Sequence, residues 1–293
     1  MKIAIYALKY NEKVKSALLT LTNFLTNNRA DIYVDYSLHK EIIDLKEFES
    51  TREKLFSYSK LNKTFDFLIS MGGDGTILRA ITQVKDLEIP IVGINTGNLG
   101  FLSTIKIDNI ENALKKIFNG KYKISNRCLL SIETDSKSVK FDLNFALNEI
   151  AVGRKNTTSM ISIKTWLDDE YLTSYWADGL IISTPTGSTG YSLSCGGPVI
   201  MPESESLVLT PIAPHNLSAR PLVIPAKHKI SLKISGRENE FLVSLDSRIN
   251  SLKNSTTITI KKAPYSIKMI ELDGGSFIET LRKKLLWGVD QRN

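Results

Sequence analysis

An acidic residue stands inside a glycine-rich turn at residues 72–76, which read Gly-Gly-Asp-Gly-Thr. The apolar run at residues 65–71 predicts a buried strand before the turn, and residues 77–81 begin an amphipathic helix after it. Glycines at such a junction let a phosphate approach main-chain amides at a helix N-terminus, where the helix dipole favours negative charge. Asp74 would repel that phosphate unless a cation or a hydroxyl lay between them. The pattern therefore predicts phosphoryl transfer, with Mg2+, to a hydroxyl that Asp74 orients or deprotonates. An ordinary Asp-Gly turn is the alternative interpretation.

Two further stretches place polar residues where a nucleotide would need them. Residues 95–102 read Asn-Thr-Gly-Asn-Leu-Gly-Phe-Leu and follow a short apolar strand expected at residues 90–94. In an α/β sheet this loop and the glycine turn are expected to open at the same edge. Asn148 and Glu149 are adjacent polar residues within an apolar strand. They are expected to meet either other protein groups, in a structural network, or the hydroxyls of a ribose.

A third stretch, residues 184–194, is rich in small hydroxylated residues and glycine and follows the strand expected at residues 180–183. Many donors with little bulk suit the recognition of phosphate and sugar, although an exposed Ser/Thr loop would look the same. Residues 243–248 form a strand that ends in a turn with both signs of charge, at Asp246 and Arg248. Taken alone, that turn is typical of a protein surface.

The composition is that of a globular protein, with 293 residues, 42% of them hydrophobic and 24% charged. No apolar run reaches the roughly 20 residues that span a bilayer, and the chain starts with a strand-like segment, so we expect a cytoplasmic protein without a membrane partner. The net charge of +7 suits phosphorylated ligands. The basic clusters are short and lack interleaved aromatic residues, which argues against nucleic acid. Cys128, Cys195 and three histidines have no zinc-site spacing, so no residue is predicted as a direct metal ligand.

The order of elements predicts two domains and a C-terminal segment. Strands and helices alternate over residues 1–104, which predicts a Rossmann-like α/β domain with a parallel sheet. Residues 105–265 begin with a helix at residues 109–119 and continue as a mostly antiparallel, β-sandwich-like domain. Its strands are expected at residues 129–133, 142–152, 161–167, 171–176, 180–183, 207–212, 230–235, 241–245 and 257–261. Residues 266–293 contain an amphipathic helix at residues 277–287 that is expected to pack back on the first domain.

Together, these stretches resemble the NAD kinase family over most of the chain. The resemblance rests on the glycine turn, the loop at residues 95–102, Asn148-Glu149, Asp178-Gly179 with residues 184–189, and Asp246. The glycine turn is shared with related lipid kinases and phosphofructokinase-like enzymes, whereas residues 184–189 in their strand context are specific. The P-loop and the G-x-G-x-x-G fingerprint are both absent, so a nucleotide would be bound by another route.

What the resemblance implies is transfer of a phosphoryl group from ATP, with Mg2+ or another divalent cation, to the 2′-hydroxyl of the adenosine ribose of NAD, giving NADP. Asp74 would be the general base or orienting carboxylate. The C-terminal β domain would bind NAD, and the protein would form a homodimer or homotetramer with NAD sites completed across subunits. The residues that would line the NAD site are Gly75, Arg79, Phe101, Asn148, Glu149, Asp178, Thr189, Gly190, Tyr191, Ser192, Leu193, Ser194, Asp246 and Arg248.

Two positions depart from the pattern that the resemblance implies. Gly190 stands where the family most often has Ala, and Arg248 stands where a glutamine is usual. Two other functions are kept as alternatives. One is a kinase for a lipid or sugar hydroxyl, which would need a different acceptor site. The other is a non-catalytic dinucleotide-binding or nucleic-acid-binding protein.

Overall fold

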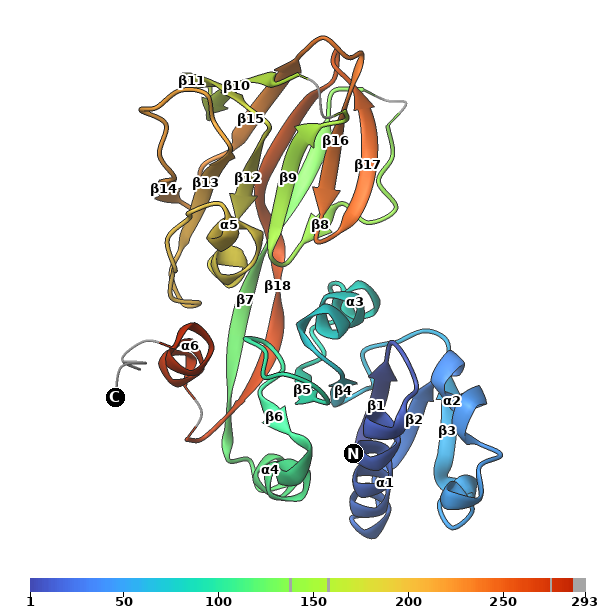
Figure 1. The fold of residues 1–293 in the computed structure, drawn as a ribbon. Helices are drawn as coiled ribbons and strands as arrows, with labels where there is room; N and C mark the ends of the chain where they lie inside the picture. Colours follow the sequence, from blue (N-terminus) through green and yellow to red (C-terminus); the bar gives the residue numbers. More distant parts are fainter. Residues whose placement is uncertain (137–138, 157–158, 275, 287–293) are drawn as a thin grey trace. The chain divides into compact units, whose positions relative to one another are not determined.

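The computed structural model describes residues 1–136, 139–156, 159–274 and 276–286. The chain divides into two compact units, which are described separately (Figure 1). Unit 1 comprises residues 1–126 and 267–293, and unit 2 comprises residues 127–266. The expected mixture of an α/β region and a β-rich region is confirmed. The division falls at residue 126 instead of residue 104, because the helix at Ile110–Phe118 is buried in the core of unit 1.

Unit 1 is built on a parallel sheet with the strand order β18-β5-β4-β1-β2-β3, and β6 pairs with β5. Every residue of β4 and β5 is buried, as expected for central strands of a parallel sheet. Both strands end at the loops that the sequence singled out. The strands are β1 Lys2–Ala7, β2 Asp31–Asp35, β3 Leu55–Tyr58, β4 Phe67–Met71, β5 Ile91–Asn95, β6 Ile105–Lys106 and the C-terminal part of β18 Thr257–Leu272.

Three helices of unit 1, α1, α2 and α6, begin at side chains that accept hydrogen bonds from the first helical turn. The side chain of Asn11 accepts from Val14 N at 3.0 Å, and that of Ser276 accepts from Glu279 N at 3.0 Å. The apolar faces of α1 and α4 belong to one core cluster with the sheet. The helices are α1 Glu12–Asn27, α2 Tyr36–Ile42, α3 Asp74–Val84, α4 Ile110–Phe118 and α6 Phe277–Leu285, with 3-10 turns at Lys46–Phe48, Arg52–Lys54 and Ile107–Asn109.

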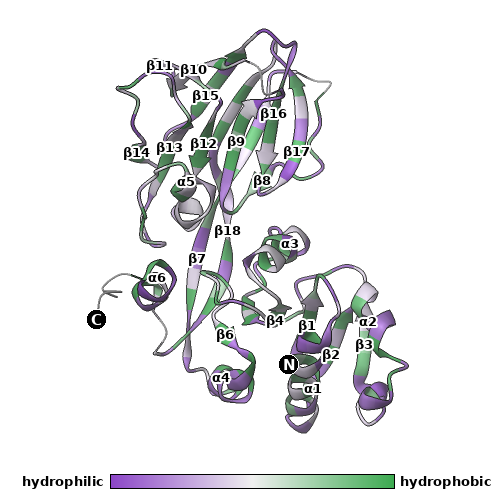
Figure 2. Cartoon of the chain, viewed as in Figure 1, coloured by the Kyte–Doolittle hydropathy of each residue, from purple (hydrophilic) through white to green (hydrophobic). Residues whose placement is uncertain are grey.

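Unit 2 consists of two sheets around a second core cluster. One has the order β14-β13-β12-β9-β16-β17 and is antiparallel throughout. The other has the order β11-β10-β15-β18, and β7 pairs with β18 and β8. Every second residue is buried in β15 and β16, and the strands of this unit change between hydrophobic and polar colouring along their length (Figure 2).

The elements of unit 2 match the expected period-2 segments with a few differences. Its elements are β7 Tyr122–Thr134, β8 Phe145–Ala146, β9 Glu149–Arg154, β10 Ile161–Leu167, β11 Glu170–Ala177, β12 Gly179–Ser183, a 3-10 turn Thr186–Thr189, α5 Tyr191–Ser194, β13 Ser206–Ile212, β14 Leu222–Pro225, β15 Ile230–Ser235, β16 Glu240–Leu245 and β17 Arg248–Lys253. The strand expected at residues 142–152 is instead two strands that break at Leu147 and Asn148. Four strands, β3 and β6 of unit 1 and β14 and β17 of unit 2, were not expected because their segments are short or largely polar. The end of the helix expected at residues 277–287 lies outside the described residues.

Candidate functional site

The glycine turn joins β4 to α3, as the sequence predicts, and Gly72 makes the junction possible. Gly72 has φ +151, a conformation that favours glycine, and a Cβ there would lie 2.1 Å from the Thr76 hydroxyl oxygen. Its amide donates to Ile94 O at 2.9 Å, which ties the turn to the end of β5. Gly73 and Gly75 are exposed, and a Cβ at either would meet nothing within 4 Å. The start of α3 therefore presents open space to a ligand.

Asp74 is the first residue of α3, and its carboxylate binds three consecutive main-chain amides of the loop after β5. Oδ2 accepts from Phe101 N at 2.7 Å. Oδ1 accepts from Leu102 N and from Ser103 N, each at 3.0 Å. A carboxylate has about four lone-pair positions, so Oδ2 keeps one for a further donor. Because Asp74 is only half-buried, a ligand hydroxyl can reach it.

The loop at residues 95–103 is shaped to receive this carboxylate. A Cβ at Gly100 would lie 1.9 Å from Asp74 Oδ1, so only glycine leaves the carboxylate its place. The Ser103 hydroxyl donates to Gly72 O at 2.9 Å. The Asn95 side-chain amide donates to the carbonyls of Asn98 and Ser103, while its oxygen accepts from Gly97 N at 2.7 Å. The two glycine-bearing loops, which were predicted to lie close together, are thus joined directly by hydrogen bonds. Ser103 and Gly100 were not among the predicted site residues, although both lie in or next to the loop that the sequence singled out.

A second aspartate in unit 2 binds main-chain amides in the same way. Asp246 accepts from Leu147 N at 2.6 Å, Asn148 N at 2.7 Å and Glu149 N at 3.2 Å. Its side chain is 1% exposed, compared with the partly exposed Asp74. Burial raises the pKa of the Asp246 carboxyl, and the three amides and the Arg248 guanidinium oppose that rise. Asp246 therefore holds the segment that carries Asn148 and Glu149 rather than presenting an oxygen to solvent.

Glu149 is the first residue of β9 and carries a strongly perturbed carboxyl group. Burial, followed by the nearby Asp246 carboxyl, raises the pKa of Glu149 to about 7, although the Tyr191 amide acts in the opposite direction. Its Oε2 is buried and has no hydrogen-bond partner among the described residues. A Cβ at Gly190 would lie 3.1 Å from this oxygen and 3.5 Å from the Asn148 side-chain nitrogen. The missing Cβ of Gly190 thus avoids a tight contact with both polar side chains, and a hydroxyl donor would satisfy the buried oxygen.

Several hydroxyl groups of the hydroxyl-rich stretch after β12 form hydrogen bonds with other protein groups. The Thr184 hydroxyl donates to Leu147 O at 2.6 Å, and Gly187 packs so closely that a Cβ there would lie 2.0 Å from Asn148 O. Ser192 is buried and shares a hydrogen bond of 2.8 Å with the Thr210 hydroxyl. Thr184 and Gly187 thus help to position Asn148, since Thr184 N also donates to Asn148 O at 2.9 Å. Among the predicted ligand contacts of this stretch, Tyr191 and Ser194 are exposed and Thr189, Gly190 and Leu193 are partly exposed.

Asp178 and Arg248, also predicted to line the site, have protein partners. Asp178 Oδ2 lies 2.9 Å from Arg154 Nη2, and both side chains are about a quarter exposed. The Arg248 guanidinium donates to Leu245 O at 3.1 Å, to Leu143 O at 3.2 Å and to Phe145 O. Arg248 thus ties the β16–β17 turn to the segment before β9. Arg154 was missed because an arginine at the end of a strand carries no local signal of its partner.

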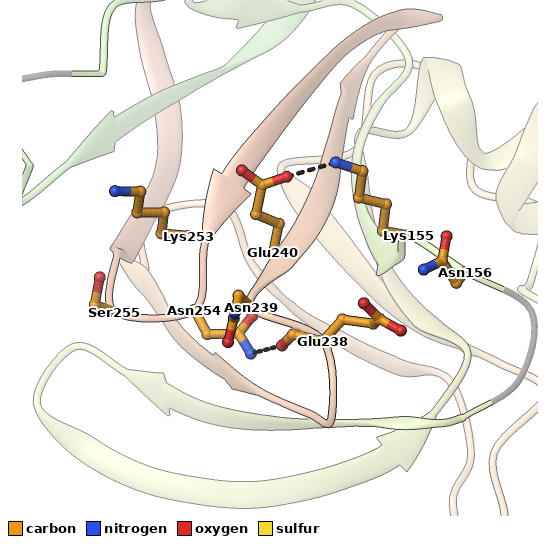
Figure 3. Close-up of a pocket in the computed structure, with 8 residues that line it drawn as sticks. All are labelled: Lys155, Asn156, Glu238, Asn239, Glu240, Lys253, Asn254 and Ser255. Carbon is orange, nitrogen blue, oxygen red and sulfur yellow. Dashed lines mark hydrogen bonds and ion pairs between the residues drawn. The ribbon is translucent and has the colours of Figure 1, made fainter.

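A pocket of about 710 Å3, which none of these residues lines, lies at the loops that follow β9, β15 and β17 (Figure 3). An ion pair of 2.5 Å between Lys155 and Glu240 crosses it, and the Asn254 side chain donates to Glu238 O at 2.5 Å. Its lining is polar, and two of its charged side chains, Lys155 and Glu240, are paired with each other. None of the predicted site residues lines this pocket. We therefore assign the chemistry to the glycine turn, the loop at residues 95–103 and the segments around Asn148 and Gly190, and not to the pocket.

The predicted site residues form one group in each unit. Unit 1 holds Asp74, Gly75, Arg79 and Phe101, with Arg79 exposed on α3. Unit 2 holds the other predicted residues, from Asn148 to Arg248. No three His, Cys, Asp or Glu side chains in the described part of the chain converge as a metal site. None of the described helices is long and apolar enough to cross a membrane.

Comparison with known proteins gives consistent matches over both units. A family model described as the ATP-NAD kinase N-terminal domain matches residues 3–122, and one described as the ATP-NAD kinase C-terminal domain matches residues 147–272. Relatives named NAD kinase from Flavobacterium psychrophilum and Christiangramia forsetii are each 54% identical, and the alignments cover all of both chains.

Two solved structures resemble the fold of the whole chain. Yeast NADH kinase complexed with NADH has a TM-score of 0.88 and 25% identity, with 99% of this chain and 89% of that chain covered. An NAD kinase from Archaeoglobus fulgidus in complex with ATP has a TM-score of 0.72 and 27% identity, with 98% and 99% covered.

Proposed function

Because the chain belongs to the NAD kinase family, we propose that Asp74 is the residue at which it deprotonates or orients the acceptor hydroxyl of NAD. The chain is an enzyme that phosphorylates NAD to NADP. The alternatives of a lipid or sugar kinase and of a non-catalytic dinucleotide-binding protein are therefore set aside, since relatives named NAD kinase match along the entire chain.

The observation that carries the role of Asp74 is its carboxylate, held by three amides with one lone-pair position left on Oδ2. The amides fix the orientation of the carboxylate, so the remaining position points in one direction. The 2′-hydroxyl of the adenosine ribose would donate to this position. As the ribose oxygen attacks the γ-phosphorus of ATP, its proton moves to Asp74, the new oxygen–phosphorus bond forms, and the bond to the β-phosphate oxygen breaks to release ADP.

We propose that Mg2+ reaches the site on the phosphates of ATP. The described residues offer no cluster of three carboxylate, imidazole or thiolate ligands. Mg2+ in kinases is usually held by substrate phosphates together with one or two carboxylates. Binding of this kind does not require the three-ligand cluster that the described residues lack. When bound, Mg2+ neutralises charge on the transferring phosphoryl group. The open N-terminus of α3 at Gly73 and Gly75 would receive the phosphates through main-chain amides.

We propose that Asn148 and Glu149 bind a ribose of NAD. Glu149 Oε2 is a buried acceptor without a partner among the described residues, and Gly190 places no Cβ against it. A ribose hydroxyl would supply the missing donor. Asp246 acts through these two residues by holding their main chain. Gly75, Arg79, Phe101, Asp178, the segment from Thr189 to Ser194 and Arg248 remain predicted contacts of the dinucleotide.

We also propose that the protein is a homo-oligomer in which unit 2 supplies the interface. Large apolar side chains are exposed there, among them Trp176 at 54% and Leu217 at 90%. The Trp176 ring lies 4.7 Å from that of His215, so the exposed indole is held in place. Light scattering after size exclusion would give the mass, and a monomer at micromolar concentration would refute this proposal. The cytoplasmic location stays a prediction.

The experiment that tests the catalytic role is the Asp74→Asn variant. Asparagine is isosteric with aspartate and neutral, so we expect turnover to fall on the order of 10²–10⁴ while the affinity for NAD stays nearly intact. Formation of NADP from NAD, ATP and Mg2+ is measured in a coupled assay, and NAD binding is measured by calorimetry. Turnover at the wild-type level in this variant would refute the role of Asp74.

A further inference from the structure

The C-terminal helix α6 contacts the same loop that holds Asp74. Lys284 Nζ donates to Leu99 O at 2.8 Å, across 185 residues of sequence. The helix is anchored in unit 1 by Leu281, which is 6% exposed, and its first turn is capped by Ser276. These contacts place the last described helix of the chain against a loop between β5 and β6.

Two aromatic contacts reinforce the hydrogen bond. The rings of Phe101 and Phe277 are 5.9 Å apart at an angle of 40°, and Lys284 Nζ lies 5.3 Å from the centre of the Phe101 ring. Phe101 is the residue whose amide donates to Asp74 Oδ2. Helix α6 therefore contacts the Phe101 side chain and the Leu99 carbonyl. The amides of residues 101–103 bind the Asp74 carboxylate.

The loop has few other restraints between its ends. Gly97 and Asn98 are exposed, and Gly97 and Gly100 lack side chains. Within the loop, the Asn95 side chain bonds to the main chain of Gly97, Asn98 and Ser103, and Gly100 N donates to Ser103 O at 3.3 Å, whereas the Ser103 hydroxyl donates to Gly72 O outside the loop. Leu99 and Phe101 lie between these fixed points, and α6 is the element that contacts both of them. The position of the Phe101 amide therefore depends on the helix.

We propose that α6 is a positioning element for catalysis, in which Lys284 and Phe277 fix the loop whose amides orient the Asp74 carboxylate. This inference rests on the proposed function of Asp74. It adds Lys284 and Phe277 as positioning residues, which act on the reacting groups only through Leu99 and Phe101. Loosening the loop would leave Asp74 present but less well oriented, which lowers turnover more than substrate affinity.

A matched control is available in the neighbouring residue. Lys283 is also on α6 and its side chain is 59% exposed, but it pairs with Glu279 at 2.6 Å instead of contacting the loop. Lys283→Ala removes the same charge from the same helix. A general electrostatic effect on the anionic substrates would therefore appear in both alanine variants, whereas an effect through the loop would appear in Lys284→Ala alone.

The experiment compares wild type, Lys284→Ala, Lys284→Arg, Lys283→Ala, Phe277→Leu and Asp74→Asn in the full-length protein. In Lys284→Ala and Phe277→Leu we expect kcat to fall roughly tenfold and the KM for ATP to change by less than about twofold. Lys284→Arg should recover most of the activity, because a guanidinium can also donate to Leu99 O and lie over a ring. Lys283→Ala should match wild type.

Hydrogen exchange tests the loop without relying on activity. The amides of Phe101, Leu102 and Ser103 should exchange at least about tenfold faster in Lys284→Ala, because their bonds to Asp74 would open more often, while amides of β4 should be unchanged. Wild-type turnover and exchange in Lys284→Ala, in a protein that Asp74→Asn inactivates, would overturn this inference alone. Equal losses in Lys283→Ala and Lys284→Ala would also overturn it. Wild-type turnover in Asp74→Asn would overturn the proposed function and the inference together.

Discussion

Replacing Glu149 by glutamine should remove a specific part of the pH dependence of stability. The carboxyl of Glu149 has an ordinary pKa of 4.5, and burial together with the Asp246 carboxyl raises its pKa to about 7 in the folded protein. Below pH 4.5 the group is protonated in both states. As the pH rises from 4.5 to 7, the unfolded chain ionises Glu149 first, so the free energy of unfolding falls. Above pH 7 the group is ionised in both states and its contribution stops changing.

The size of this effect follows from the two pKa values. Between 4.5 and about 7 lie roughly 2.5 pH units, each equivalent to about 1.36 kcal/mol, which gives an upper limit of roughly 3 kcal/mol. Partial exposure of Glu149 lets solvent screen the charge and reduces the value. A difference of about 1–3 kcal/mol between wild type and Glu149→Gln is therefore expected to develop between pH 4.5 and pH 7.

Denaturant unfolding of the two proteins without nucleotides, at several pH values from 4.5 to 8, measures this difference. Trp166 and Trp176 both belong to unit 2, so in a Trp287→Phe background tryptophan fluorescence reports the unit that carries Glu149. Other groups titrate over the same range, and those that do not interact with Glu149 cancel in the comparison, whereas the interaction of Glu149 with Asp246 is part of the measured difference. Glu170→Gln changes an exposed glutamate of the same unit and should leave the wild-type pH dependence unaltered. Parallel stability curves for wild type and Glu149→Gln would refute the raised pKa and the buried, unpartnered state of this carboxyl.

Two further substitutions test other contacts of the site. Gly100→Ala places a Cβ 1.9 Å from Asp74 Oδ1 and should lower kcat by about 10²-fold with little change in melting temperature, so wild-type turnover would contradict the close fit of this loop. Arg248→Gln removes a guanidinium that donates to three carbonyls, including that of Phe145, and should cost about 1–3 kcal/mol of stability, measured by thermal unfolding. An unchanged melting temperature would show that these bonds are replaced by water.

The sequence predicted the elements whose local pattern is strong. The alternation of apolar strands and amphipathic helices in the first part of the chain, and the period-2 segments after it, gave the fold class that the structure shows. Gly72 was recognisable because a glycine at a strand–helix junction can adopt a backbone conformation that other residues rarely adopt. Asp74 was recognisable as the acidic residue within the same turn. The strands β3, β6 and β14 were missed because they are too short to show a period of two, and β17 was missed because it is largely polar. All four depend on pairing with their neighbours.

The residue types at the site were thus determined by the sequence, but their partners were decided by the tertiary structure. Asp74 meets amides 27 to 29 residues later, and Asp246 meets amides 97 to 99 residues earlier. No periodicity encodes such pairs, because they form only when strands distant in sequence come together in a sheet. The raised pKa of Glu149 has the same origin, since burial and the nearness of Asp246 exist only after folding. The sequence therefore identified the carboxylates, and folding decided that Asp74 stays partly exposed while Asp246 is enclosed by the chain.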